Sequence, residues 1–310
     1  MANASAIAAD YPTKPITLIC TAAPGGSDDT LGRAFALVAE KYLGQPMVVV
    51  NKAGASGLID GLAGAQAAPD GYTLTITATS LTGAIEFEIA EGRKPPFTRH
   101  DFSNIIIFNM SPTLVVVPYD SPWKTLADLV NDAKAKPGRY VFCSGSLYSS
   151  SHLASELLAS TFGLQFNHVP YTGGGPCLSA LVGKHADFAT QYPGTSVPLI
   201  KGKKLRALAV QSSQRLRALP DVPSVKELGI DIEFYGWGGI SAPLKTPMPI
   251  VEKLREASKK VVEDKAYIDM IEKRGDEVHF KLGDEMTKYW DGEATMTAKL
   301  IKKLLAEGKK

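Results

Sequence analysis

Short apolar runs alternate with amphipathic stretches along this chain, and glycine or proline separates most of them. The first apolar run, residues 16–20, is followed by a glycine pair and a helical pattern whose apolar face carries Leu31, Ala34, Phe35, Val38 and Tyr42. A second apolar run, residues 47–51, precedes the glycine-rich residues 54–61 and a small-residue helix. This order of strand, helix, strand and helix predicts a parallel α/β arrangement.

The same unit of strand, loop and helix recurs in the middle of the chain. Strands are predicted at 140–143 and 166–171, each followed by a serine-rich or glycine-rich loop and a helix that begins at His152 or Pro176. Further strands are predicted at 72–77, 105–108, 114–117, 187–191, 205–210 and 234–240, and further helices at 125–135, 250–262 and 283–305. We expect residues 78–83 to form a hydroxyl-rich loop and residues 84–103 to be irregular, because Pro95 and Pro96 exclude a regular element there.

Length and charge narrow the class of protein. A chain of 310 residues is too long for most single cores and favours two domains. The net charge is only +2, without a concentrated basic patch, which argues against nucleic acid or an anionic membrane as a partner. No stretch holds the roughly 18 uninterrupted apolar residues of a membrane span. Residues 1–10 lack the basic start and apolar centre of a signal peptide, and we interpret them as what remains after one is cleaved.

Three strand-to-helix loops, residues 24–30, 144–152 and 172–176, are rich in hydrogen-bond donors and contain no Lys or Arg. Such loops gather at the carboxyl ends of strands in open α/β sheets, where ligands bind. The amides of a first helical turn and the helix dipole attract a carboxylate or phosphate without any basic side chain. Each loop taken alone is equally well explained as a structural turn. The candidate ligand-binding residues are Pro24, Gly25, Gly26, Ser27, Asp28, Asp29, Ser80, Ser144, Ser146, Tyr148, Ser149, Ser150, His152, Tyr171, Thr172, Gly173, Gly174, Gln191 and Tyr192.

Two acids in the first loop have alternative interpretations. Asp28 and Asp29 either favour the positive end of a helix or accept a hydrogen bond from a hydroxyl or ammonium group of a ligand. A hydrolase or lyase that uses His152 beside a serine is an alternative to simple binding, but the Gly-x-Ser-x-Gly turn of a hydrolase is missing. We therefore assign no catalytic residue.

Cysteine and histidine spacing gives no sign of a metal site or a cofactor. None of the five histidines has the spacing of a chelating pair, and no dinucleotide fingerprint or nucleotide-phosphate loop occurs, so we expect neither a metal nor a cofactor. Cys20 lies in an apolar strand and is expected to be a small buried residue. The sequence leaves open whether Cys143 and Cys177 form a disulfide.

An ordered set of short motifs, taken together, resembles the tripartite tricarboxylate transporter family of substrate-binding proteins, also called Bug receptors. The motifs are Ala23-Pro-Gly-Gly-Ser27 with Asp29, Ala68-Pro-Asp-Gly-Tyr-Thr73, Ser151-His-Leu-Ala154, Val169-Pro-Tyr171 with Gly173-Gly174, residues 202–210, Leu219-Pro-Asp-Val-Pro223 and Ala242-Pro243. Each motif alone is unspecific, but their order along nearly the whole chain is characteristic of the family.

The resemblance implies a periplasmic receptor with a two-lobed periplasmic-binding-protein fold of the type II kind, each lobe a mixed sheet flanked by helices. The first lobe is expected at residues 11–109 plus 233–310 and the second at 110–232, joined by crossing strands. The family implies that the lobes close over a small organic carboxylate and deliver it to a membrane permease. We expect the chain to act as a monomer without catalytic activity. A sensor that presents its ligand to a signalling partner is the alternative.

This chain departs from the family pattern at three places. Asp28 stands where a small or hydroxyl residue is frequent, Tyr148 where a glycine is common, and Gln191-Tyr192 where Asp-Asn is frequent. Asp28 adds a negative charge and Tyr148 adds a phenol. A simple dicarboxylate is therefore a less obvious ligand than a carboxylate that also carries a hydroxyl, amine or aromatic group.

Overall fold

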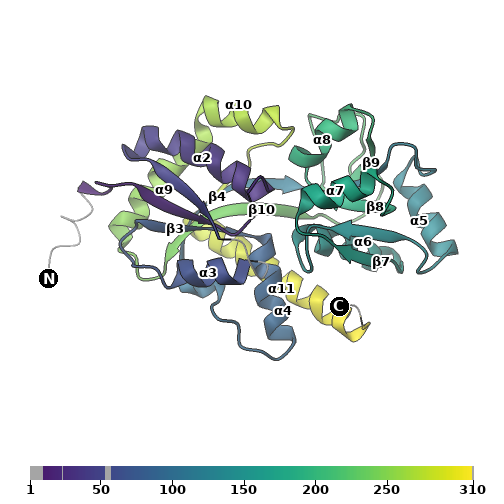
Figure 1. Cartoon of the computed structure of the whole chain (residues 1–310), viewed down its shortest axis with the longest axis horizontal. Helices are drawn as coiled ribbons and strands as arrows, with labels where there is room; N and C mark the ends of the chain where they lie inside the picture. The colour runs from purple at the N-terminus through teal and green to yellow at the C-terminus, as the bar shows by residue number, and fades with distance from the viewer. Residues whose placement is uncertain (1–9, 23, 53–56, 309–310) are drawn as a thin grey trace. The chain divides into compact units, whose positions relative to one another are not determined.

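The computed structural model describes residues 10–22, 24–52 and 57–308, which divide into two compact units (Figure 1). Unit 1 contains the described residues up to Met110, Trp237–Ile271 and the described residues from Glu277 to 308. Unit 2 contains Ser111–Gly236 and Glu272–Asp276. The predicted α/β class is confirmed, because each unit is a mixed sheet flanked by helices.

Unit 1 is built on a six-stranded sheet with the order β11-β4-β10-β3-β1-β2. Its strands are β1 (Ile16–Cys20), β2 (Met47–Asn51), β3 (Thr73–Ala78), β4 (Phe102–Pro112), β10 (Tyr235–Pro243) and β11 (Lys281–Leu282). Strand β1 runs parallel to β2 and β3, whereas β10 is antiparallel to β3 and β11 is antiparallel to β4. The predicted parallel pattern therefore holds for the first three strands, and the returning strand β10 makes the sheet mixed.

Helices cover both faces of this sheet. They are α2 (Ser27–Leu43), α3 (Leu58–Ala65), α4 (Thr79–Ala90), α9 (Met248–Glu263), α10 (Lys265–Lys273), α11 (Gly283–Ala306) and the 3-10 helix η2 (Arg99–Asp101). Successive side chains of β3 point to opposite faces, and a glycine in each of two helices lets the backbone approach them. A Cβ on Gly32 of α2 would clash with Ile76, and a Cβ on Gly64 of α3 would clash with Thr75. Helices α2 and α3 therefore pack on opposite faces of β3 (Figure 1).

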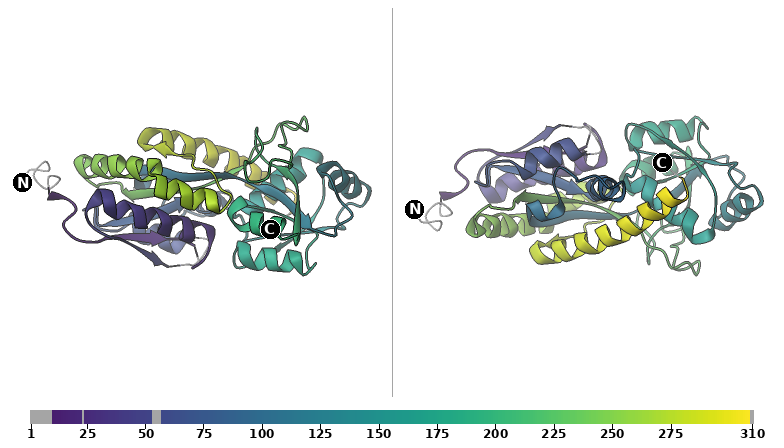
Figure 2. Two further views of the ribbon diagram at one scale, coloured as in Figure 1. Left: turned by 90° about the horizontal axis from the view of Figure 1, so that it is seen from above. Right: turned by 90° about the horizontal axis from the view of Figure 1, so that it is seen from below.

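The apolar core of unit 1 joins the sheet to α2 and α9, with Phe35, Ile76 and Leu254 among its buried residues. On the other side, α4 and the C-terminal helix α11 lie side by side, and Trp290 donates a hydrogen bond from Nε1 to Thr82 Oγ1 at 2.8 Å (Figure 2).

Unit 2 is built on a five-stranded sheet with the order β7-β6-β8-β5-β9. Its strands are β5 (Leu114–Pro118), β6 (Val141–Ser144), β7 (Asn167–Pro170), β8 (Phe188–Gln191) and β9 (Leu205–Val210). Phe142 and Phe188 pack against α5 (Leu126–Ala135) and α6 (Ser150–Phe162), whereas Cys143 and Ala189 pack against α7 (Gly174–Val182) and α8 (Pro193–Lys201). The alternation along β6 and β8 thus places one helix pair on each face.

The structure shows whether Cys143 and Cys177 are paired, which the sequence left open. Cys143 of β6 and Cys177 of α7 form a disulfide with a Cα–Cα distance of 5.6 Å. This bond fastens the beginning of α7 to the sheet. Cys20 is a buried free thiol in β1, as predicted.

Two local predictions are wrong. Residues 79–90 form helix α4 rather than a loop and an irregular segment, because Pro95 and Pro96 lie beyond the helix and do not interrupt it. Helices α8 and α10 were not predicted, and in α8 the interior Pro198 hides the helical pattern. The N-cap residue of α2 is Gly26, and Ser27, Asp28 and Asp29 form its first turn.

Candidate functional site: uncapped helix starts and their loops

The glycine turn before α2 is held by Asp29, which is 2% exposed. Its carboxylate accepts hydrogen bonds from the Gly25 N–H at 2.8 Å, from Arg33 Nε at 2.9 Å and from Asn51 Nδ2 at 2.8 Å. Burial acts to raise the pKa of this carboxyl, but these three donors outweigh burial and lower the pKa. Asp29 therefore stays ionised, and its carboxylate is engaged by its own unit.

The neighbouring acid, Asp28, is in the opposite situation. It is half-buried, and within the described part of the chain no hydrogen bond or ion pair engages its carboxylate. One carboxylate oxygen faces Gly238 of β10, at 3.5 Å from the position of an added Cβ. Burial raises the pKa of Asp28 to about 6. Its carboxylate is thus a hydrogen-bond acceptor that the first turn of α2 does not use.

Ser80 lies near the same strand. It occupies the first turn of α4, two residues after Ala78, and Ala78 pairs with Gly238. Ser80 is therefore a helical residue on the strand pair that Asp28 faces, although it was predicted to lie in a loop.

Three helices that follow the candidate loops begin without a side-chain cap. Their N-cap residues are Gly26 for α2, Ser149 for α6 and Gly173 for α7, and no cap side chain binds a first-turn amide. Gly173 has φ 147°, a conformation that side chains rarely adopt. Helix starts of this kind present backbone N–H groups and the positive end of the dipole, which is the environment that anions bind.

The serines of the α6 loop bind each other and the loop backbone. Ser149 Oγ accepts from the Ser146 N–H at 3.2 Å and donates to the Ser146 carbonyl at 2.7 Å, while Ser151 Oγ accepts from the Gly145 N–H at 3.0 Å. Ser144, which is fully buried, donates to the Ser146 carbonyl at 2.9 Å. The loop is therefore preorganised, and the Ser149 hydroxyl contacts Ser146 and the Ser151 hydroxyl rather than a first-turn amide of α6.

A stack of aromatic rings supports this loop. The rings of His152 and His168 lie 4.0 Å apart at 8°, and Phe142 stacks on His168 at 4.6 Å. Burial lowers the pKa of His168 to about 4, so this ring is neutral at neutral pH. Because the one proton of Ser144 goes to a carbonyl, His168 Nε2 donates the 2.7 Å hydrogen bond to Ser144 Oγ.

His152 is also a structural partner of the loop. Its Nδ1 accepts a hydrogen bond from the Tyr148 N–H at 2.9 Å. Tyr148 takes a positive φ of 55° and is 3% exposed. A base in a serine mechanism needs a lone pair for the serine proton, and the Nδ1 lone pair is occupied.

The loop that precedes α6 meets the start of α7 at one glycine. A Cβ on Gly145 would lie 3.2 Å from the Gly174 nitrogen, so only glycine lets the two loops come this close without displacement. The Tyr171 N–H donates to the Ser144 carbonyl at 2.9 Å. Gln191, 2% exposed, donates from Nε2 to Cys177 Sγ at 3.2 Å. The structure thus brings the unit 2 candidates from the α6 loop, the α7 loop and β8 to one edge of the sheet.

The remaining candidates take different places. Pro24 and Thr172 are exposed, Gly26, Ser27, Ser146, Tyr171 and Tyr192 are partly exposed, and Ser150 is 8% exposed. The candidate list missed Gly145, Ser151 and His168. The hydroxyl run at 149–151 could have pointed to Ser151, whereas the ring stack of His168 has no sequence signal.

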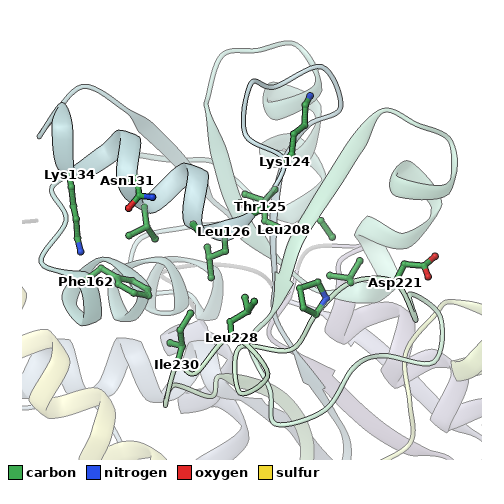
Figure 3. A pocket seen from close by; sticks show the side chains of 15 residues that line it. Lys124, Thr125, Leu126, Asn131, Lys134, Phe162, Leu208, Asp221, Leu228 and Ile230 are labelled. Atoms are coloured by element: carbon green, nitrogen blue, oxygen red, sulfur yellow. The ribbon is translucent and has the colours of Figure 1, made fainter.

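A separate hollow of about 600 Å³ lies in unit 2 between α5, β9 and residues 221–230 (Figure 3). Leu126, Phe162, Leu208, Leu228 and Ile230 form its apolar wall, and Lys134 and Asp221 lie at its edge. None of the candidate residues lines it, so this hollow is distinct from the helix-start site.

Within the described ranges, none of the helices is long and apolar enough to cross a membrane. Nor do the described residues contain a group of three or more His, Cys, Asp or Glu side chains arranged to hold a metal ion.

Comparisons with known proteins agree in pointing to one family. Residues 31–305 match the model of the tripartite tricarboxylate transporter family receptor. The chain is 31% identical over 318 residues to Protein BugT from Bordetella pertussis, covering 96% of this chain and 94% of that protein.

Solved structures show the same similarity. A ligand-free TctC solute binding protein from Polaromonas is 32% identical with a TM-score of 0.76, covering 95% of this chain and all of that chain. A protein from R. palustris with adipate is 26% identical with a TM-score of 0.84, covering 94% of this chain and 98% of that chain. This chain therefore belongs to the tripartite tricarboxylate transporter receptor family, whose members are solute-binding receptors.

Proposed function

We propose that this chain is a periplasmic receptor that binds a small organic carboxylate and delivers it to the permease of a tripartite tricarboxylate transporter. The observation that carries the proposal is the close approach, at Gly145, of the loop that precedes α6 to the start of α7, two helices that begin without a side-chain cap. The loops around them contain no Lys or Arg, so backbone amides and hydroxyls supply the recognition. Each hydrogen bond to a charged group contributes about 1.5–3 kcal/mol, so several amides and hydroxyls together can offset the cost of ordering a small ligand.

The adipate-bound relative supports the same ligand class. Adipate carries a carboxylate at each end, and one carboxylate matches what a helix start binds. No catalytic step is proposed, since the family consists of binding receptors and His152 Nδ1 already accepts the Tyr148 N–H.

For the ligand of this chain we propose a second group, a hydroxyl or an ammonium, that donates a hydrogen bond to Asp28. The unused carboxylate of Asp28 favours such a donor over a second carboxylate, because two negative charges at short range repel. Malate and aspartate are still dicarboxylates, but they carry a hydroxyl and an ammonium that adipate lacks, so a comparison with adipate tests for the donor.

Titration calorimetry with adipate, malate, aspartate and the neutral diamide of adipate tests the ligand class. We expect at least one carboxylate to bind and the diamide to fail, and at one hundred times its dissociation constant the bound carboxylate should stabilise the fold by about 2.7 kcal/mol. Binding of the diamide with no binding of any carboxylate contradicts the proposal.

A pair of glycine variants tests whether the loops before α6 and α7 form the binding site. Gly145→Ala adds a methyl group 3.2 Å from the Gly174 nitrogen and should weaken carboxylate binding by displacing α7 from the α6 loop. Gly292→Ala, in α11, adds the same group where nothing lies within 4 Å and is the matched control. Equal affinities in the two variants would remove this loop pair from the site.

A further inference from the structure

The segment Glu272–Asp276 belongs to unit 2, although the chain before and after it belongs to unit 1. It begins in the last turn of α10 and leads toward β11. Strands β4 and β10 each cross once from one unit to the other, whereas this segment leaves unit 1 and returns to it within five residues. The contacts that the segment makes in unit 2 therefore indicate what it does there.

The segment packs closely on α8 at two points. Gly275 takes φ 87°, and a Cβ added there would lie 2.9 Å from Val197 Cγ2. A Cβ added to Gly194, in the first turn of α8, would clash with Asp276 Oδ2. A glycine on each side of the contact thus allows the segment to reach the helix start, and Gly275 also needs its freedom at positive φ.

Asp276 places a carboxylate at the start of α8, which has no cap of its own. The N-cap residue of α8 is Tyr192, which makes no side-chain cap bond, and the Asp276 carboxylate lies against the backbone of Gly194, 3.8 Å from Arg274 Nε. Asp276 is 3% exposed, and Ser111 Oγ donates to its other oxygen at 2.8 Å. A carboxylate at the positive end of a helix is a stabilising arrangement.

The start of α8 continues directly from the candidate site. Residues Gln191-Tyr192 join β8 to α8, and we call them the β8–α8 corner. The Gln191 side chain lies at the start of α7, since its Oε1 is 3.0 Å from the position of a Cβ on Gly174 and its Nε2 binds Cys177. A displacement of the start of α8 would therefore move Gln191 and Tyr192, and through the Gln191 side chain it would move the start of α7.

We propose that Asp276 is a positioning residue that holds the β8–α8 corner, and through Gln191 the α7 start, in the geometry that binds the carboxylate. The effect on binding rests on the proposed function, whereas the effect on the corner does not. Asp276 lies more than eighty positions along the chain from Gly194, so the corner is set by a segment that arrives from the chain of unit 1.

Hydrogen exchange of the ligand-free protein tests the first step. Asp276→Asn keeps the shape of the side chain but removes the charge, and Gly194→Ala displaces the carboxylate by its methyl group. In both variants we expect the amides of residues 191, 192 and 194–196 to exchange at least tenfold faster, while amides 126–135 of α5 stay unchanged. Glu227→Gln is the matched control, because Glu227 is a unit 2 carboxylate that accepts a backbone N–H, from Ser224 at 2.9 Å. Unchanged exchange at 191–196 in both variants overturns the proposal.

Calorimetry with adipate and malate tests the second step. For whichever probe the wild type binds, we expect Asp276→Asn to raise the dissociation constant five- to tenfold and Glu227→Gln to leave it unchanged. Faster exchange at 191–196 with an unchanged dissociation constant means that Asp276 only stabilises α8, which overturns the positioning role. If the wild type binds neither probe, the carboxylate proposal fails for these probes, and the exchange experiment still decides whether Asp276 holds the corner.

Discussion

Helices α5 and α6 of unit 2 both begin after a hydroxyl residue, yet the two hydroxyls do different things. At α5, Thr125 Oγ1 accepts from the Asp128 N–H at 3.2 Å and the Asp128 carboxylate accepts from the Thr125 N–H at 2.9 Å. This reciprocal capping box satisfies two amides. At α6, Ser149 binds back to Ser146, and the first turn has no side-chain cap. A serine or threonine before a helix therefore does not by itself show that the helix start is closed to a ligand.

The start of α7 extends this comparison, because it is fastened without any cap. The disulfide between Cys143 and Cys177 ties its first turns to β6, where α5 uses a capping box. Covalent attachment lets α7 keep its amides unpaired with side chains and still hold its position. We infer that the disulfide holds the start of α7 in place and leaves its amides accessible to a ligand. At α5, by contrast, the capping box that stabilises the helix start also occupies its amides.

Removing the disulfide should have the largest effect. Cys143→Ala with Cys177→Ala opens a loop with a sequence separation of 34, and chain entropy predicts a loss of about 4 kcal/mol of unfolding free energy. Urea denaturation of the oxidised protein and of the double variant measures this loss. Cys20→Ala is the control for a buried thiol without a bond. Equal stability of the oxidised wild type and the double variant would show that α7 is held by packing alone.

Giving α6 a side-chain cap should strongly weaken binding. Ser149→Asp places a carboxylate at the N-cap position, where it competes for the first-turn amides and repels an anionic ligand. We expect carboxylate affinity to fall about 100-fold, or ~2.7 kcal/mol, without loss of stability in the ligand-free protein. Calorimetry and thermal unfolding together check both parts. Retained affinity would place the ligand away from α6.

The reverse change at α5 should affect stability alone. Thr125→Ala removes one half of the capping box and should cost about 1–2 kcal/mol of unfolding free energy. Carboxylate affinity should stay that of the wild type, because α5 contributes none of the candidate residues. A weaker affinity in this variant would mean that the two helix starts are coupled.

The pKa values of two acids in first helical turns should be shifted in opposite directions. Backbone amides of Lys124 and Thr125 lower the pKa of Asp128, whereas burial raises the pKa of Asp28 from 3.8 to about 6. Because Asp28 holds its proton more tightly when folded, its contribution to stability is favourable below pH 4 and is lost as the pH rises to 6.

Relative to wild type, Asp28→Asn should therefore gain stability between pH 4 and 6, on the order of 1 kcal/mol after solvent screening is allowed for. Carboxyl NMR titration together with unfolding at several pH values measures both quantities. A pKa of Asp28 at or below 3.8 would show that an amide or a cation engages it after all.

The sequence predicted the strands and loops that carry the site, because their signals are local. Apolar runs and glycine pairs mark β1, β6 and the starts of α2 and α7, and those elements lie where they were expected. Helix α4 was mistaken for a loop because its hydroxyl-rich start reads as a turn, although the packing against α11 makes it a helix. Tertiary contact decided what local propensity left undecided.

The sequence did not show which carboxylate, that of Asp28 or that of Asp29, is hydrogen-bonded within the protein and which remains available to a ligand. Asp29 finds Asn51 at the end of β2 and Arg33 one turn along α2, and only the folded chain brings that strand end to the loop. The same holds for Ser149, whose partner Ser146 is close in sequence but depends on a backbone turn stabilised by His152 and Tyr148. Which side chains remain available to a ligand is thus a property of the hydrogen-bond network.

The lack of Lys and Arg in the three loops has a consequence for ionic strength. A site that relies on counter-charges loses affinity as salt screens them, over a distance of about 8 Å at physiological ionic strength. Amides in a first helical turn act at hydrogen-bond distance and are screened far less. Capture by this protein should therefore change little between dilute and saline surroundings.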